Sequence, residues 1–151
     1  MTSADRPTAI LFDAGGTLLL QDTEEMGRLL GVSIDAAWAH RAHYEAMAEY
    51  SDLQLAGQDV DWVWWMERYF TILGVVDPHL AGERTGHGYG LWNRALEGVG
   101  NAVQQLRDSG VRVAVVSNAD GSVRGSLGTA GLLDLFEFVR NKRFNATDPF
   151  A

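Results

Sequence analysis

Residues 8–18 read Thr8-Ala9-Ile10-Leu11-Phe12-Asp13-Ala14-Gly15-Gly16-Thr17-Leu18, an apolar run that ends in an aspartate and two glycines. The run shows no alternation of polar and apolar side chains, which is typical of a parallel strand covered on both faces. Gly15 and Gly16 interrupt regular structure after Asp13. We therefore predict a buried strand over residues 8–12, followed by a glycine-rich loop that begins with a carboxylate.

A second apolar run of the same kind occupies residues 111–116 and leads into the polar segment Ser117-Asn118-Ala119-Asp120-Gly121. It predicts another buried strand. Helical spacing of apolar residues flanks this strand on both sides, at residues 99–106 and 123–130. Because strands and helices alternate, this part of the chain favours an α/β fold with a parallel sheet and right-handed crossovers.

The pattern near the end of the chain is weaker. Residues 136–139 predict a third strand, and the tail from Arg140 to Ala151 has no clear periodicity, so we expect it to be loose.

Residues 21–93 have a different pattern, without buried strands. A helical apolar stripe runs from Asp61 to Leu73, and alanines share one face of residues 35–50. Residues 22–30 and 78–92 predict further helices, although glycines weaken the second. We interpret residues 21–93 as an all-helical insert.

Composition narrows the functional classes. The net charge of −8 argues against a nucleic-acid partner, because phosphate backbones attract basic faces. No apolar run approaches the length of a membrane span, and the N-terminus does not resemble a secretory signal. The chain has no cysteine, hence no disulfide framework or thiol nucleophile, which fits a cytoplasmic protein.

The two polar loops carry the chemistry that the sequence suggests. In an open parallel sheet, ligands lie at the carboxyl ends of the strands, where both loops are expected. Ser117 and Asn118 offer a hydroxyl and an amide that suit phosphate oxygens, and Asp13 can serve as a covalent nucleophile. Taken singly, each loop is more readily explained by structure, Asp13 as a strand-end cap and residues 117–120 as a polar turn. The two loops together, with a helical insert between them, favour the functional interpretation.

At this point the residues resemble a known family. Residues 10–18 look like the first motif of the haloacid dehalogenase-like superfamily, an apolar strand followed by Asp-x-Asp-Gly-Thr. Residues 113–118 are similar to the second motif, and residues 96–110 resemble the return to the core in phosphoglycolate phosphatase-like members. The resemblance implies a Rossmann-like parallel-sheet core, residues 1–20 and 94–151, with an inserted α-helical cap, residues 21–93.

The resemblance also implies roles for single residues. Asp13 attacks the phosphoryl group of a small phosphorylated substrate and forms an aspartyl-phosphate. Another Asp13 oxygen and the carbonyl of Gly15 hold Mg²⁺, which offsets the charge of the transferring group. The residues implied to bind or shape the phosphate site are Gly16, Thr17, Ser117 and Asn118.

Gly15 departs from the family pattern. Phosphatases of the family usually have a second aspartate there as general acid, and such an acid contributes roughly 10²–10⁴-fold. We therefore expect activity to favour good leaving groups. Phosphonoacetaldehyde hydrolases also have a small residue there, but they need a lysine in the cap. The only lysine of this chain is Lys142, outside the predicted cap, so this branch is disfavoured. The 2-haloacid dehalogenases stay open as an alternative.

The third and fourth family motifs are not visible. Lys142 follows the predicted third strand too closely, and Asp148 stands alone in a short tail. The resemblance therefore indicates a C-terminally truncated member with impaired activity. The competing hypothesis is a non-catalytic remnant that binds an anion or a protein partner. Either form is expected to have an exposed sheet edge, and a homodimer would use this edge or the cap.

Other conspicuous residues are interpreted structurally. We place His40 and His43 on the cap surface and do not assign them a metal, since no further ligands lie near them in the sequence. His79 and His87 flank a glycine-rich stretch, where a loop role and a place at the cap opening are equally compatible. The cluster Trp62, Trp64 and Trp65 predicts helix core more strongly than a substrate platform.

Overall fold

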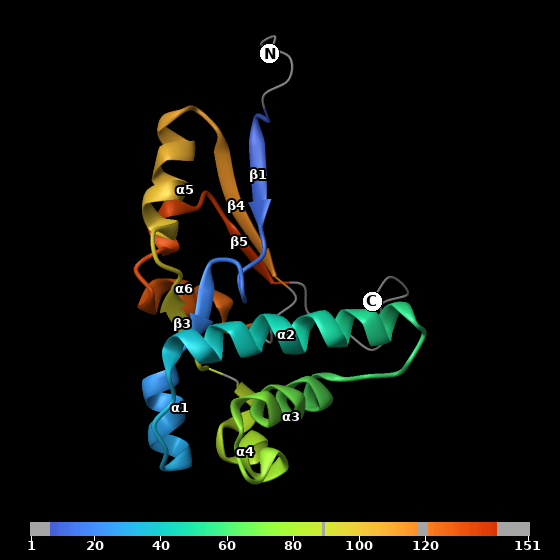
Figure 1. Ribbon diagram of the computed structural model, residues 1–151. Helices are drawn as coiled ribbons and strands as arrows, with labels where there is room; N and C mark the ends of the chain where they lie inside the picture. The colour runs from blue at the N-terminus through green and yellow to red at the C-terminus, as the bar shows by residue number, and fades with distance from the viewer. Residues whose placement is uncertain (1–6, 89, 118–120, 142–151) are drawn as a thin grey trace. The chain divides into compact units, whose positions relative to one another are not determined.

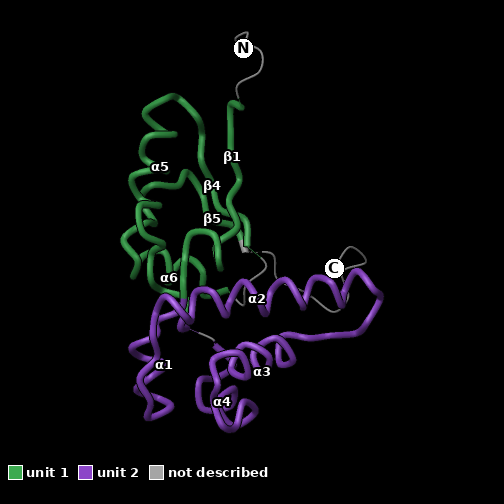
Figure 2. Tube along the Cα trace, viewed as in Figure 1, with its two compact units in different colours: residues 1–20, 92–151 green, residues 21–91 purple. Residues whose placement is uncertain are grey.

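The computed structural model describes residues 7–88, 90–117 and 121–141. The chain divides into two compact units, and Figure 2 shows them in different colours. Unit 1 comprises residues 1–20 and 92–151, and unit 2 comprises residues 21–91. The sequence analysis set the second boundary two residues later, between residues 93 and 94. That unit 2 acts as a cap stays a prediction.

Unit 1 is built on a three-stranded parallel sheet in the order β1-β4-β5. The strands are β1 (Ala9–Phe12), β4 (Arg112–Ser117) and β5 (Val139–Asn141). In the register, Phe12 pairs with Val115, and Val115 pairs with Val139. The α/β class and the parallel sheet expected from the sequence are thus confirmed.

The third strand corrects the sequence analysis. It begins at Val139 rather than at residue 136, because Leu133–Leu135 forms the short 3₁₀ helix η3 and the pairing with β4 starts only at Val139. Arg140 and Asn141, expected to be loose, belong to β5, where parallel pairing with β4 fixes their backbone. The rest of the expected loose tail, residues 142–151, lies outside the described residues.

One face of the sheet is covered by α5 (Val99–Asp108) and α6 (Val123–Thr129), which lie on the same side of the strands in Figure 1. Val103 of α5 and Leu127 of α6 join Val113 and Val115 of β4 in a buried cluster. The opposite face carries Leu11, Val116 and Phe138, which are 63%, 38% and 46% exposed. Parallel sheets usually have both faces covered, so this apolar face is unusual.

Unit 2 is helical, as predicted. Its helices are α1 (Thr23–Leu30), α2 (Ala36–Leu55), α3 (Trp62–Leu73) and α4 (Pro78–Arg84), followed by the short 3₁₀ helix η2 (Gly86–Gly88). The apolar stripe of α3 buries Trp65, Met66, Tyr69 and Phe70. The alanine face of α2 is also buried, and small side chains there let the two helices pack closely. Within the described residues, no helix has the length and apolar character needed to cross a membrane.

The helix expected over residues 78–92 is shorter than predicted, since α4 ends at Arg84. Gly86 and Gly88 have positive φ angles, and so does His87 between them, at 53°. Such backbone conformations cannot continue a right-handed helix. Trp92 instead begins the strand β3 (Trp92–Ala95), which pairs with β2 (Leu19–Gln21). Both short strands were missed by the sequence analysis.

Candidate active site

Asp13 and Ser117 stand at the ends of neighbouring strands. Asp13 follows Phe12, the last residue of β1, and Ser117 is the last residue of β4. Since Phe12 pairs with Val115, the register brings Asp13 level with Val116. Neighbouring strands lie about 4.8 Å apart, so residues distant in the sequence meet at one edge of the sheet. Asp13 is exposed, whereas Ser117 is 4% exposed.

The loop after Asp13 is folded around one carbonyl group. The oxygen of Ala14 accepts hydrogen bonds from the backbone N–H groups of Thr17, Leu18 and Leu19, at 3.3, 2.9 and 3.0 Å. Ala14 itself is 2% exposed. The N–H of Gly16 donates to the carbonyl of Leu19 at 2.8 Å, and Gly16 has a φ of 75°, which favours glycine. The loop thus has a fixed shape directly beside the candidate nucleophile.

This hydrogen bonding refines the expected phosphate contacts. The backbone N–H groups of Gly16 and Thr17 both donate inside the loop. Gly16 therefore suits the role of shaping the loop, and Thr17, which is exposed, offers its side-chain hydroxyl to an anion. Asn118, the remaining predicted phosphate ligand, lies outside the described residues, as does Asp120. The assignment of Gly16, Thr17, Ser117 and Asn118 to a phosphate site stays a prediction.

Gly15 lies against an aromatic ring that the sequence analysis did not connect with the site. A Cβ atom at Gly15 would lie 3.7, 3.8 and 3.9 Å from Cε3, Cζ3 and Cδ2 of Trp92. These are ordinary van der Waals distances to the six-membered ring of the indole. Trp92 is half-buried at the start of β3, 77 residues after Gly15 yet in the same unit. Only the pairing of β2 with β3 brings it to this loop, so no local pattern signals it.

A magnesium site was expected from Asp13 and the Gly15 carbonyl. Magnesium prefers about six oxygen ligands, usually one or two carboxylates together with water and substrate phosphate. In the part of the chain that the structure describes, no three His, Cys, Asp or Glu residues are grouped so that they would hold a metal ion. The described residues thus supply part of a ligand set.

His43 corrects the sequence analysis, which placed it on the surface. It is 6% exposed, and its ring packs edge-on against Trp65 with the centroids 5.4 Å apart. Burial lowers the pKa of His43 to about 4, with a smaller contribution from His40. A neutral imidazole is therefore part of the core of unit 2. The sequence does contain a signal for this burial, namely the alanine spacing of α2, because His43 directly follows Ala42 on the buried face of the helix.

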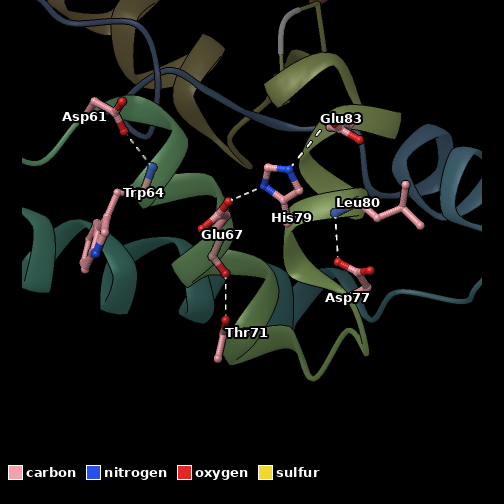
Figure 3. Close-up of polar contacts among 8 residues, drawn as sticks. All are labelled: Asp61, Trp64, Glu67, Thr71, Asp77, His79, Leu80 and Glu83. Carbon is pink, nitrogen blue, oxygen red and sulfur yellow. Dashed lines mark hydrogen bonds and ion pairs between the residues drawn. The ribbon is translucent and has the colours of Figure 1, made fainter.

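The other marked residues of unit 2 have structural roles. Trp65 is fully buried, as the helix-core interpretation predicts, while Trp62 and Trp64 are half-buried. Figure 3 shows His79 on α4 between Glu67 and Glu83. His79 Nδ1 is 2.7 Å from Glu67 Oε1, and its Nε2 is 3.7 Å from Glu83 Oε1. The hydrogen bond with Glu67 raises the pKa of His79.

Comparison with known proteins identifies the family. A family model described as haloacid dehalogenase-like hydrolase matches residues 7–148. The chain belongs to this family. A comparison with curated protein sequences gave no significant match. Membership agrees with the resemblance drawn from residues 10–18 and 113–118.

Solved structures of haloacid dehalogenase-like proteins share the fold. A dehalogenase has 22% identity and a TM-score of 0.54, and the alignment covers 91% of this chain and 63% of the dehalogenase chain. The L-2-haloacid dehalogenase of Xanthobacter autotrophicus, with chloropropionic acid covalently bound, has 20% identity and a TM-score of 0.53, over 90% and 57%. The HAD-hydrolase YfnB of Bacillus subtilis, bound to magnesium, has 14% identity and a TM-score of 0.56, over 89% and 63%.

These alignments also define what is shared. The chain spans 57–63% of the length of these three structures. At such identities the likeness concerns the fold alone and does not extend to the reaction or the substrate.

Proposed function

We propose that the chain carries the part of a hydrolase site that holds the nucleophile. Asp13 cleaves small phosphate esters through an aspartyl-phosphate intermediate. The observation that supports this most is the register of β1 with β4, which brings the chain after Phe12 level with the end of β4. An exposed carboxylate and a serine hydroxyl thereby belong to adjacent strand ends, where α/β folds bind their ligands.

The chemistry follows from the groups at this edge. An Asp13 oxygen attacks phosphorus, the bond to the ester oxygen breaks, and the alcohol portion leaves with the electron pair. Water then attacks the phosphorus of the aspartyl-phosphate, which releases inorganic phosphate and restores the carboxylate. The hydroxyls of Thr17 and Ser117 are the proposed donors to the phosphoryl oxygens, because each can donate one hydrogen bond.

Magnesium is part of this proposal. If bound, it would supply positive charge at the phosphoryl oxygens. Asp13 and the Gly15 carbonyl are the described groups proposed to hold it, and the structure of YfnB bound to magnesium gives a precedent for the ion on this fold.

The leaving group decides which esters are suitable. Gly15 offers no side chain for proton transfer, so a departing alkoxide would receive no proton from this position. Esters with weakly basic leaving groups avoid this requirement. We therefore propose aryl and acyl phosphates as the substrate class that the site hydrolyses fastest.

A carbon–halogen hydrolase is the second candidate, and the same glycine favours it. A halide ion leaves without a proton, and Asp13 would attack carbon to form an ester that water then hydrolyses. The comparison with the L-2-haloacid dehalogenase, which holds chloropropionic acid covalently, gives a precedent for this chemistry on the fold.

The decisive experiment compares the wild-type chain with Asp13→Asn, which removes the nucleophile but keeps the size of the side chain. Phosphate release from p-nitrophenyl phosphate and from an alkyl phosphate is measured with and without Mg²⁺, and chloride release from 2-chloropropionate in parallel. We expect p-nitrophenyl phosphate to be the preferred substrate and Asp13→Asn to lower its turnover at least about 10³-fold.

The other outcomes are equally informative. Chloride release that requires Asp13 would favour the carbon–halogen hydrolase. Equal background rates for both proteins on every substrate would contradict the enzyme proposal and support the non-catalytic remnant.

A further inference from the structure

Trp92 lies against Gly15, the residue at which, by the resemblance drawn from residues 10–18, the family's phosphatases usually have an aspartate. Its six-membered ring lies within 3.7–3.9 Å of the position of a Cβ at Gly15. We propose that Trp92 is a specificity-determining residue, which gives the candidate nucleophile an aromatic neighbour and selects substrates that carry an aryl or other flat apolar group. This inference rests on the proposed function, because it concerns the same site.

The distance from the ring to the nucleophile suits such a role. Gly15 is two residues after Asp13, so their Cα atoms are at most about 7 Å apart. A group bonded to a phosphoryl or carbon centre at Asp13 therefore reaches the space over Gly15. Gly15 is exposed and Trp92 is half-buried, so the contact between the ring and the loop lies near the surface of unit 1.

The backbone around Trp92 holds the ring in place. Trp92 begins β3, which pairs with β2, the strand that directly follows the nucleophile loop. The N–H of Leu96 donates to the carbonyl of Leu18 at 3.0 Å, which ties the far end of β3 to the same loop. The indole thus belongs to a strand whose end is hydrogen-bonded to the loop that the indole contacts. Trp92 is the only tryptophan in the sequence of unit 1.

Gly15 and Trp92 explain each other's residue type. A polar carboxylate at residue 15 would place its charged oxygens beside an aromatic carbon surface, which offers them no hydrogen bond. With glycine at residue 15, the surface that the ring presents to the loop is aromatic carbon. Stacking or edge contacts between aromatic rings favour aryl over alkyl groups by about threefold to tenfold in affinity.

Binding of unreactive phosphonates tests this inference separately from turnover. Phenylphosphonate and methylphosphonate carry the same anionic group and differ in the apolar part. We measure the dissociation constant of each by isothermal titration calorimetry on the full chain, for the wild type and for Trp92→Leu, Trp92→Phe and Phe138→Ala.

We expect wild type to bind phenylphosphonate about threefold to tenfold more tightly than methylphosphonate. Trp92→Leu keeps apolar volume but lacks a ring, and should reduce this ratio to near one while leaving methylphosphonate affinity unchanged. Trp92→Phe should retain most of the ratio. Phe138→Ala removes an exposed aromatic ring just before β5 in the same unit and should leave the ratio as in wild type.

Two outcomes would overturn the inference in different ways. A ratio near one in wild type, or a ratio that Trp92→Leu leaves intact, would show that Trp92 selects nothing while the anion site stands. Binding of neither phosphonate would contradict the anion site itself, and with it the proposed function. Circular dichroism of each variant shows that unit 1 is folded, and rescue by Trp92→Phe separates a ring contact from a loss of structure.

Discussion

His43 illustrates how burial gives a single residue its properties. The imidazole lies beneath the surface of unit 2, with Trp65 against its edge, and its pKa falls to about 4 from the ordinary value of 6.5. Protonation is therefore easier in the unfolded chain than in the folded one. The stability that depends on neutral His43 is complete above pH 6.5 and is lost as the pH falls toward 4.

We predict that the free energy of unfolding decreases on acidification below pH 6.5, by at most about 1.4 kcal/mol per pH unit from this residue. Urea titrations over this pH range measure the slope. His43→Gln cannot titrate and should give a shallower slope.

His79→Gln is the matched control. The pKa of His79 is raised, so its small, solvent-screened contribution is present at low pH and lost as the pH rises through its folded pKa. Its removal should not flatten the acid slope. An unchanged slope in His43→Gln would contradict the prediction.

At the scale of the element, the helices α1 to α4 of unit 2 share the same kind of N-terminal cap. An aspartate precedes each of α1, α2, α3 and α4, and its Oδ1 accepts a hydrogen bond from the backbone N–H three residues later, at 3.1, 2.6, 2.9 and 3.0 Å. The aspartates are Asp22, Asp35, Asp61 and Asp77. Their negative charge also suits the positive end of the helix dipole.

We predict that Asp61→Ala lowers the free energy of unfolding by about 1 kcal/mol, because the N–H of Trp64 loses its acceptor. Figure 3 shows this contact at the start of α3. Asp61→Asn retains an acceptor oxygen and should lose clearly less. Chemical denaturation monitored by circular dichroism gives both values, and equal losses in the two variants would show that the cap hydrogen bond is not the cause.

For the whole molecule, charge and apolar surface are divided between the units. Residues 21–91 contain twelve acidic and four basic side chains, so the net charge of −8 comes from unit 2, while unit 1 has eight of each. Unit 1 also has the sheet face on which Leu11, Val116 and Phe138 are partly exposed. In the described residues, β1 pairs with β4 alone, so its other edge has no strand neighbour.

We propose that copies of this chain associate through the β1 edge and this sheet face, where charge repulsion is smallest. Phe138→Glu should weaken association about tenfold. Val76→Glu is the matched control, since it adds the same charge at a residue that is fully exposed on the loop before α4 in unit 2. Sedimentation velocity over a concentration series measures both, and a wild type that stays monomeric at all concentrations would contradict the proposal.

The sequence by itself determined the features that depend on neighbours in the chain. Unbroken apolar runs predicted β1 and β4, since a buried parallel strand needs apolar residues on both faces. Apolar spacing predicted α3 and the buried alanine face of α2, and the motif at residues 10–18 identified the family that the comparison then showed. The same sequence patterns predict that the candidate site lies at the carboxyl ends of the strands.

The tertiary structure alone decided the features that depend on residues far apart. The pairing of β2 with β3 is carried by segments too short to show a period, and it brings Trp92 to Gly15. The burial of His43 follows from how α3 packs on α2, and the hydrogen bonds inside the loop decide that Gly16 shapes it. Local patterns record which residues prefer burial or a turn, whereas these contacts arise only when the folded chain brings distant residues together.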